Sequence, residues 1–390
     1  MNRNKGVTGP KGFRAAGVAA GIKESGALDL TLVVNDGPND AAAGVFTTNV
    51  VKAAPVLWSQ QVIASRRLGA VVLNSGGANA CTGPEGFQDT HATAEKVAEV
   101  LNIGAIDVAV CSTGLIGERL PMDAVRFGVE KAAKELADTV DAGLNAATGV
   151  MTTDSRPKQS WDSHPDGWSV GGFVKGAGML APNMATMLSV ITTDAVIDGA
   201  ALDAALRQAT SRTFDRLDVD GGTSTNDTVL VLASGASGVT PSAEDFVALL
   251  TKVAGDLVKQ LQGDAEGVTK EVSIVVRGAA TEAEAVHVGR TVAEDNLVKT
   301  ALFGSDPNWG RIAMALGRAD AVIDPDKLGI AINGITLCAN GTRAQDRSLA
   351  DLTGRDIEVV IDLNVGASEA TVLTTDLSHA YVEENSAYSS

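Results

Sequence analysis

An early part of the chain has the same order of elements, an apolar strand, a loop and a helix, two times in succession. Residues 69–73 are apolar and strand-like, a glycine-rich loop follows them, and residues 89–101 have the spacing of a helix. The second unit has a strand at 107–111, the turn Ser112–Gly117 and an amphipathic helix at 121–136 that opens with proline. This alternation predicts a mixed α/β fold whose loops lie at strand ends, where sites usually form.

The later part of the chain continues the same mixture of strands and helices. Helical spacing predicts helices at 200–214 and, more strongly, at 242–263, while apolar runs predict strands at 271–276 and 357–363. Residues 154–172 are polar, carry two tryptophans and form the most linker-like segment of the sequence. We therefore expect two lobes with a soft boundary between them.

Length and charge limit the possible functions. A chain of 390 residues with 45% hydrophobic content can bury one large core or two ordinary ones. The net charge of −17 would repel a nucleic-acid backbone or an anionic membrane surface, which excludes both as partners. The N-terminus has no apolar signal segment, and no run of about 18 apolar residues follows it. These features predict a soluble cytoplasmic protein.

The cysteines predict thiols and no disulfide framework. Cys81, Cys111 and Cys338 are odd in number, widely spaced and set in apolar or glycine-rich surroundings. Reduced thiols fit a cytosolic protein, and each cysteine is expected to be a small buried residue. No cluster of cysteine and histidine ligands is visible, so we predict no metal site.

The composition changes abruptly at Thr186. Glycines, Pro182 and Asn183 precede it, and a β-prone run extends from it to Thr193. A threonine that opens a strand directly after a strained loop has the position of an N-terminal-type nucleophile. A β-branched residue that simply suits a strand explains the same position, and the segment alone leaves both interpretations open.

Several long sequence motifs favour the nucleophile interpretation of Thr186, because they resemble those of a known family. They are NMATML at the composition change, GFRAAGVAAGIK near the start, and MTTDSRPK, TSTNDTVL, DPNWGRIAMALGRA and YVEENSAY farther along. Together they resemble the ornithine acetyltransferase family, the self-cleaving glutamate N-acetyltransferases of arginine biosynthesis. The resemblance implies a layered α/β/β/α-type sandwich with two lobes. It also implies a cut between Ala185 and Thr186 into fragments 1–185 and 186–390, which stay associated as an α2β2 heterotetramer.

The resemblance also implies the catalytic groups. Thr186 is the expected nucleophile, and its freed α-amino group, with an ordinary pKa of about 7.7 to 8.0, can accept the hydroxyl proton. Thr113 and Gly114 match the family's oxyanion hole. This arrangement needs no histidine, and the four histidines of the chain are expected to be structural or exposed.

The implied substrates are N-acetylornithine as acetyl donor and glutamate as acceptor. Matching substrate-binding positions are Thr152, Lys175, Thr186, Glu266, Asn385 and Ser390. Without the resemblance, the polar C-terminal tail that holds the last two would be expected to fray. No cofactor is expected, and the sequence leaves open whether acetyl-coenzyme A also serves as a donor.

Two other segments resemble sites but receive no catalytic role. The loop at 74–83 lacks the Gly-Lys-Ser/Thr ending of a phosphate-binding loop and is expected to be structural or site-lining. The DPNWGR string, with Asp306, Asn308, Trp309 and Arg311, is expected to serve a loop or a subunit contact.

Three alternative functions stay open at this stage. A related self-processing aminopeptidase or amidase would let water take the acyl group. An acyltransferase of secondary metabolism would use other acyl-amino acids. A non-enzymatic amino-acid-binding protein of the same fold would not need the Ala185 and Thr186 pair.

Overall fold

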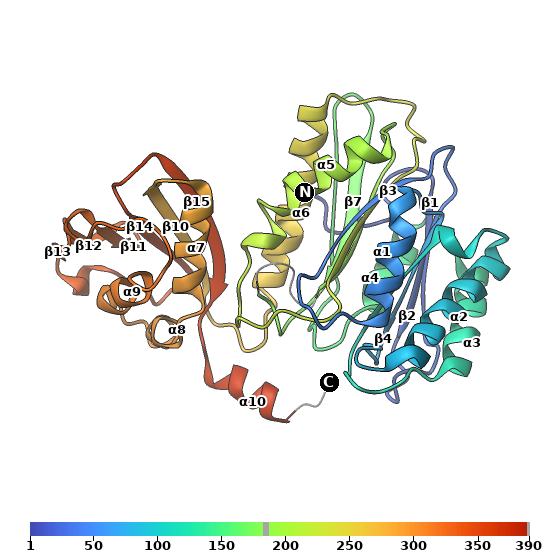
Figure 1. Ribbon diagram of the computed structural model, residues 1–390, viewed down its shortest axis with the longest axis horizontal. Helices are drawn as coiled ribbons and strands as arrows, with labels where there is room; N and C mark the ends of the chain where they lie inside the picture. Colours follow the sequence, from blue (N-terminus) through green and yellow to red (C-terminus); the bar gives the residue numbers. More distant parts are fainter. Residues whose placement is uncertain (182–186, 388–390) are drawn as a thin grey trace.

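The computed structural model describes residues 1–181 and 187–387, which form an α/β protein with a larger body and a smaller lobe (Figure 1). In Figure 1 the larger body lies at right and holds two sheets, and the smaller lobe lies at left with a third sheet. Several predicted positions lie outside the described residues, namely Pro182, Asn183, Ala185, Thr186 and Ser390.

The first sheet of the larger body has the strand order β1-β2-β4-β5. Its strands are β1 (Phe13–Val18), β2 (Leu30–Asn35), β4 (Ala70–Ser75) and β5 (Val108–Thr113). The helices that pack on it or at its edge are α1 (Ala54–Val62), α2 (Gly83–Leu101), α3 (Met122–Glu135) and α4 (Val140–Gly149). Because β4 and β5 are parallel, the loops that follow them leave the sheet at the same edge.

The second sheet has the order β3-β9-β8-β7-β6. Its strands are β3 (Ala41–Phe46), β6 (Lys158–Ser163), β7 (Ser169–Lys175), β8 (Leu188–Thr193) and β9 (Thr228–Ala233). Helices α5 (Gly199–Thr210) and α6 (Ala243–Gln262) pack against each other and against this sheet. The predicted cleavage position falls between β7 and β8, which are adjacent antiparallel strands.

The two sheets pack on one another. One hydrophobic core contains residues of both sheets, such as Val72 of the first and Val190 of the second. A separate core joins the second sheet to α5 and α6. With α2 and α3 packed on the first sheet, this gives the predicted α/β/β/α arrangement, and the predicted α/β fold class is confirmed.

The smaller lobe has its own hydrophobic core. Its sheet has the order β13-β12-β11-β14-β10-β15. The strands are β10 (Glu271–Ala279), β11 (Gly329–Ile332), β12 (Ile335–Ala339), β13 (Thr342–Arg343), β14 (Asp356–Asp362) and β15 (Ser368–Thr375). The helices are α7 (Glu282–Ala293), α8 (Asn296–Phe303) and α9 (Trp309–Leu316). After β15 the chain runs back toward the larger body and forms α10 (His379–Ala387), seen at the bottom of Figure 1.

Most of the predicted elements are present, with shifted ends. The helix predicted from residue 89 begins earlier, at Gly83, where Pro84 in the first turn and Glu85 are ordinary start signals. The helix predicted at 200–214 ends at Thr210, and a 3₁₀ turn, η3 (Phe214–Arg216), follows it. The helix predicted at 121–136 and the strands at 107–111 and 357–363 match α3, β5 and β14 closely.

The prediction of a linker at 154–172 is wrong. The segment contains β6 and the start of β7, which pair as an antiparallel hairpin inside the larger body. Trp168 is almost fully buried and stacks on Phe246 of α6. The segment looked like a linker because it is polar, yet its Lys158 is completely buried between carboxylates.

Lys158 holds the hairpin to the end of α6. Its Nζ lies 2.6 Å from Asp154 Oδ1 and 2.5 Å from Asp264 Oδ2, and all three side chains are almost wholly removed from solvent. Two buried carboxylates that share one ammonium are costly to leave without it. The polar segment therefore folds inside the protein because its charges are paired there.

We predict that Lys158→Met lowers the free energy of unfolding by about 3–5 kcal/mol, because it takes the ammonium from buried Asp264 and one of the two lysines that compensate buried Asp154. Lys252, whose Nζ lies 2.6 Å from Asp162 Oδ2 but whose side chain is mostly exposed, is the matched control. Lys252→Met should cost no more than about 1 kcal/mol. Urea unfolding followed by circular dichroism measures both values, and equal losses would contradict the prediction.

Candidate active site

The ends of four strands meet at one place in the larger body. β5 ends at Thr113 and β7 ends at Lys175, whereas β8 begins at Leu188 and β9 begins at Thr228. The strand register sets Lys175 opposite Leu188, and Leu188 opposite Thr228. Lys175 Nζ donates a hydrogen bond to Thr113 Oγ1 at 3.2 Å, which joins the end of the first sheet to the second.

A cavity of about 100 Å³ lies at these strand ends. The predicted site residues that line it are Thr113, Gly114, Thr152, Lys175, Glu266 and Asn385. The other lining residues are Ala78, Ile116, Thr153, Gly178, Met179, Ser224, Thr225 and Asn226. The structure thus brings together every predicted site residue that it describes, although they come from widely separated parts of the sequence. The individual roles of these residues stay predictions.

The turn at Gly114 requires glycine. Its φ is +129°, and a Cβ added there would lie 2.5 Å from the backbone nitrogen of Gly77. That nitrogen donates a hydrogen bond to the carbonyl oxygen of Thr113 at 3.0 Å. Because Lys175 donates to Thr113 Oγ1, the hydroxyl hydrogen of Thr113 is left to bond elsewhere. The Thr113 hydroxyl can therefore donate to a developing negative oxygen, which is the role predicted for Thr113 and Gly114.

Asn226 joins the loops around the cavity. Its Nδ2 donates to the carbonyl oxygens of Ala78 (2.7 Å) and Ser112 (2.9 Å), so it connects the entrance of β9 to the ends of β4 and β5. Through Ala78 the glycine-rich loop at 74–83 lines the cavity, as one of its two predicted roles required.

Buried charges surround Lys175. Its side chain is almost fully buried, and this burial lowers the pKa of Lys175, an effect that nearby Asp154 opposes. Burial alone would raise the pKa of Asp154, but Lys175, Lys158 and the Gly176 N–H outweigh it and hold that pKa at about 2. Asp154 Oδ2 also accepts the Thr152 N–H at 3.0 Å, so this carboxylate supports two of the predicted site residues.

Glu266, in the loop after α6, also lines the cavity. Asn385 of α10 donates to its Oε2 at 2.8 Å, which fastens the C-terminal helix over the site. The backbone at Gly178 passes so close that an added Cβ would lie 2.1 Å from a Glu266 oxygen. A side chain at position 178 would therefore displace the Glu266 carboxylate from the place that it occupies here.

Sequence reasoning missed several residues at the site. Ser224, Thr225 and Asn226 belong to the string TSTNDTVL, which we quoted for resemblance without giving its residues a role. Their signal was a run of polar residues directly before the fully buried strand β9. The apolar Ile116 and Met179 also line the cavity and carry no distinguishing sequence signal.

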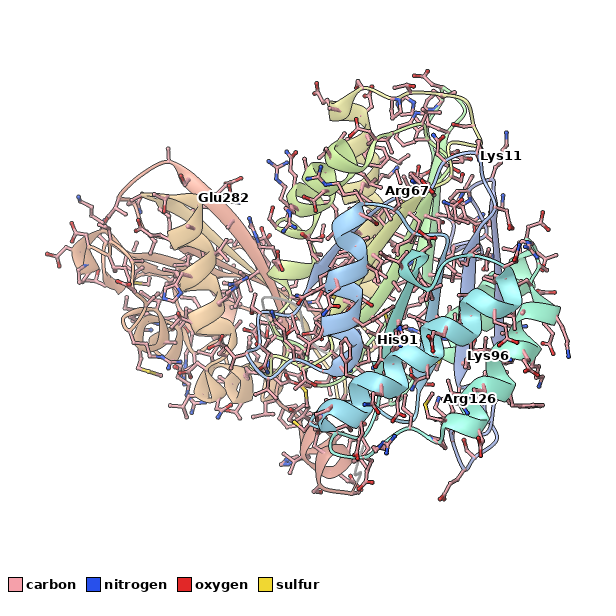
Figure 2. All side chains as sticks on the ribbon, turned by 45° about the vertical axis from the view of Figure 1, so that its right-hand side comes forward. Lys11, Arg67, His91, Lys96, Arg126 and Glu282 are labelled. Atoms are coloured by element: carbon pink, nitrogen blue, oxygen red, sulfur yellow. The ribbon has the colours of Figure 1, made fainter. Side chains whose placement is uncertain are left out.

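Other candidate residues lie elsewhere. None of the four histidines is among the described residues that line the cavity, and His91 lies half-exposed on helix α2 (Figure 2). Asn308 caps α9 by accepting the Arg311 N–H at 3.2 Å, which gives the DPNWGR string a structural role in the smaller lobe. All three cysteines are free, but the prediction that each is buried is wrong for Cys81, which the loop after β4 exposes.

The described ranges hold neither a cluster of metal ligands nor a helix suited to a membrane. In residues 1–181 and 187–387, no group of three or more His, Cys, Asp or Glu side chains could hold a metal ion. Over the same ranges, no helix combines the length and the apolar character that crossing a membrane requires.

The cavity has the character of a site for a small amino-acid-like ligand. It is small, it offers the ammonium of Lys175 and the carboxylate of Glu266, and it places a threonine and a glycine at a strand end. This combination defines an α/β protein with an enclosed site suited to chemistry on a small zwitterion.

Comparison with known proteins gives the family. The model of the ArgJ family matches residues 14–390. The arginine biosynthesis bifunctional protein ArgJ of Mycolicibacterium paratuberculosis is 59% identical over all of this chain and 97% of that protein. The ArgJ of Streptomyces coelicolor is 59% identical over 98% of this chain and all of that protein. The chain belongs to the ArgJ family.

A solved structure is also similar to part of this chain. The ornithine acetyltransferase of Mycobacterium tuberculosis, solved as a complex with ornithine, is 62% identical over 48% of this chain and 98% of the solved chain, with a TM-score of 0.46.

The charge of Asp154 should make stability depend on acidity in a defined range. Its pKa of about 2 lies below the ordinary value of 3.8, so the folded protein favours the ionised form. The stabilisation by ionised Asp154 is fully present at pH values above the pKa that Asp154 has in the unfolded chain. It is lost as pH falls toward the folded-state pKa of about 2. We predict that the difference in unfolding free energy between wild type and Asp154→Asn is constant above about pH 5 and shrinks below pH 4. A difference that stays unchanged down to pH 2.5 would contradict this.

Proposed function

We propose that this protein is a glutamate N-acetyltransferase that moves acetyl from N2-acetylornithine to L-glutamate in arginine biosynthesis, after its own chain is cut between Ala185 and Thr186. The observation that carries the proposal is the cavity, where Thr113, Lys175 and Glu266 converge at the strand ends that flank this bond. Membership of the ArgJ family, whose compared members are named arginine biosynthesis bifunctional proteins, supports the same reaction.

The cut is proposed to begin with Thr186. Its hydroxyl oxygen attacks the carbonyl carbon of Ala185, and the acyl group passes from nitrogen to oxygen, which gives an ester. Water then hydrolyses the ester and leaves residue 185 with a carboxylate and Thr186 with a free α-amino group. Thr113 and Gly114 supply the hydrogen-bond donors for the negative oxygen of each tetrahedral intermediate.

Acetyl transfer then proceeds in two half-reactions. The Thr186 hydroxyl attacks the acetyl carbonyl of N-acetylornithine, its proton passes to the α-amine of the same residue, and ornithine leaves with a proton on its amine. The amine of glutamate next attacks the acetyl-threonine ester, which releases N-acetylglutamate and restores the hydroxyl. One site serves both halves because donor and acceptor are both amino acids.

The charges around the cavity match such substrates. An amino-acid ligand brings a carboxylate and an ammonium, and the cavity offers Lys175 for the first and Glu266 for the second. Thr152 and Asn385 add polar groups at the rim, and Ser390 is proposed to do the same from the end of the chain. Hydrolysis is disfavoured in such a mechanism if glutamate fills the site before water reaches the ester.

The association of the fragments follows from the topology. Residues 1–185 would keep β7 and residues 186–390 would keep β8, and these strands pair along their whole length. We propose that the fragments remain interlocked and assemble as an α2β2 heterotetramer in the cytoplasm. Acetyl-coenzyme A is proposed as a second donor, because the compared relatives are named bifunctional.

The first test concerns the cut. Mass spectrometry of the active wild-type protein should find a fragment that begins at Thr186, and Thr186→Ala should stay uncut and inactive because it lacks the attacking oxygen. Ornithine release that depends on added glutamate separates a transferase from a hydrolase. An intact and fully active wild-type chain would refute the proposed mechanism.

The second test concerns the C-terminal helix. Asn385→Ala removes the hydrogen bond to Glu266 Oε2, so we expect a higher KM for the amino-acid substrate while chain cleavage continues. The matched control is Ser386→Ala on the next residue, because Ser386 Oγ donates to the carbonyl oxygen of Glu383 within α10 and Ser386 is not among the described residues that line the cavity. Steady-state kinetics should separate the two variants, and equal KM values would remove Asn385 from the site.

A further inference from the structure

The loop between η3 and β9, residues 217–227, contacts the chain on both sides of the predicted cleavage position. On the upstream side, Asp220 Oδ2 accepts the Met179 N–H and Oδ1 accepts the Leu180 N–H, each at 2.8 Å. The N–H of Val219 donates to the carbonyl oxygen of Leu180 at 2.5 Å. Both carboxylate oxygens of Asp220 are therefore used to hold two consecutive peptide groups.

The upstream peptide groups are held in an uncommon conformation. Met179 has a φ of +54°, which few residues other than glycine, asparagine and aspartate adopt. Such a conformation persists only where the surroundings fix it, and here the fixing contact is the carboxylate of Asp220. Leu180, the next residue, is fully buried, so the chain enters the cleavage segment from a defined point and direction.

The downstream side is held by the other end of the same loop. Asp227 Oδ1 accepts the N–H of Met187 at 3.0 Å, and the carbonyl oxygen of Met187 accepts the Thr228 N–H at 3.1 Å. Asp227 is fully buried, and its Oδ2 has no hydrogen-bond partner within the described ranges. Burial raises the pKa of Asp227 well above its ordinary range, although the Met187 N–H and Lys175 oppose the shift.

The loop is itself firmly anchored. The N–H of Asp218 donates to the carbonyl oxygen of Leu373 in β15 at 2.8 Å, and Asn226 donates to Ala78 and Ser112 at the end of the first sheet. This one short loop therefore binds the chain on both sides of residues 181–186. It is itself attached to the first sheet and to the smaller lobe.

We propose that this loop is a clamp for chain cleavage, in which Asp220 and Asp227 are positioning residues that fix the two ends of the segment containing the Ala185–Thr186 bond. The proposal rests on the self-cleavage described under the proposed function. Attack of a hydroxyl on the preceding carbonyl demands a narrow range of geometries, and fixing both ends of a short segment limits the alternatives.

The test compares cleavage rates in freshly synthesised full-length protein. Asp220→Asn leaves one acceptor oxygen where two N–H groups need one each, and Asp227→Leu removes the oxygen that accepts the Met187 N–H while keeping a side chain of similar volume. We expect each variant to slow fragment formation on the order of 10²-fold, as small misplacements of reacting groups do.

Asp194→Asn is the matched control. Asp194 is buried and accepts the N–H groups of Ser169 (2.7 Å) and Lys11 (3.1 Å) at the far end of β8. It should lose stability yet cleave at the wild-type rate. Thermal unfolding of uncut protein, measured on the Thr186→Ala background, shows whether the three substitutions destabilise the fold equally.

The outcomes distinguish the clamp from general damage. Slow cleavage in both clamp variants, with normal cleavage in an equally destabilised Asp194→Asn, supports the proposal. Wild-type cleavage rates in the clamp variants, or equal slowing in the control, overturn it. If the wild-type chain itself never cuts yet transfers acetyl, the proposed cleavage fails, and the clamp fails with it for that separate reason.

Discussion

The hydrogen bond from Lys175 to Thr113 joins the ends of the two sheets of the larger body inside the site. Each partner ends a buried strand, and each is almost completely removed from solvent. An ammonium at that depth requires compensation, which Asp154 provides, and Asp154 is in turn held by Lys158, whose second partner is Asp264. The polar hairpin of β6 and β7 is consequently a supporting structure for the cavity as well as an edge of the second sheet.

Among the described residues, the smaller lobe reaches this site through the segments that connect it to the larger body. Glu266 lies just before β10, and α10 follows β15, so the two ends of the lobe both arrive at the cavity. Tyr381 of α10 donates its hydroxyl hydrogen to Asp220 Oδ2 at 3.3 Å, which links the C-terminal helix to the loop that also holds Met179 and Leu180. The same carboxylate therefore contacts both the tail and the chain that leads to the cleavage segment.

The sequence was most informative where a local pattern determines a local structure. The strand that becomes β5 and the amphipathic helix that becomes α3 follow from apolar spacing, and the start of α6 follows from its Ser242 cap. The linker prediction for residues 154–172, which form a hairpin, failed for a physical reason. Of the two carboxylates that pair with Lys158, Asp154 is close in the sequence, but Asp264 lies about a hundred positions later, and no local pattern reveals that contact.

The same distinction applies to the site. The separate residues Thr113, Lys175 and Glu266 came from the resemblance to a family, because nothing in their neighbourhoods requires them to meet. Asp220 and Asp227 were not proposed from the sequence, since their importance lies in the backbone N–H groups that they accept. Such bonds depend on tertiary structure and leave no mark on spacing or composition.

The central position of β7 and β8 in the second sheet has a consequence for folding. An intact chain forms this sheet in a unimolecular reaction, whereas two fragments that had separated would need to find each other again. The midpoint of unfolding would then rise with protein concentration, as it does for any obligate complex. After a cut before Thr186, unfolding would no longer be readily reversible. The lifetime of the folded protein would then depend on the rate at which β7 and β8 separate.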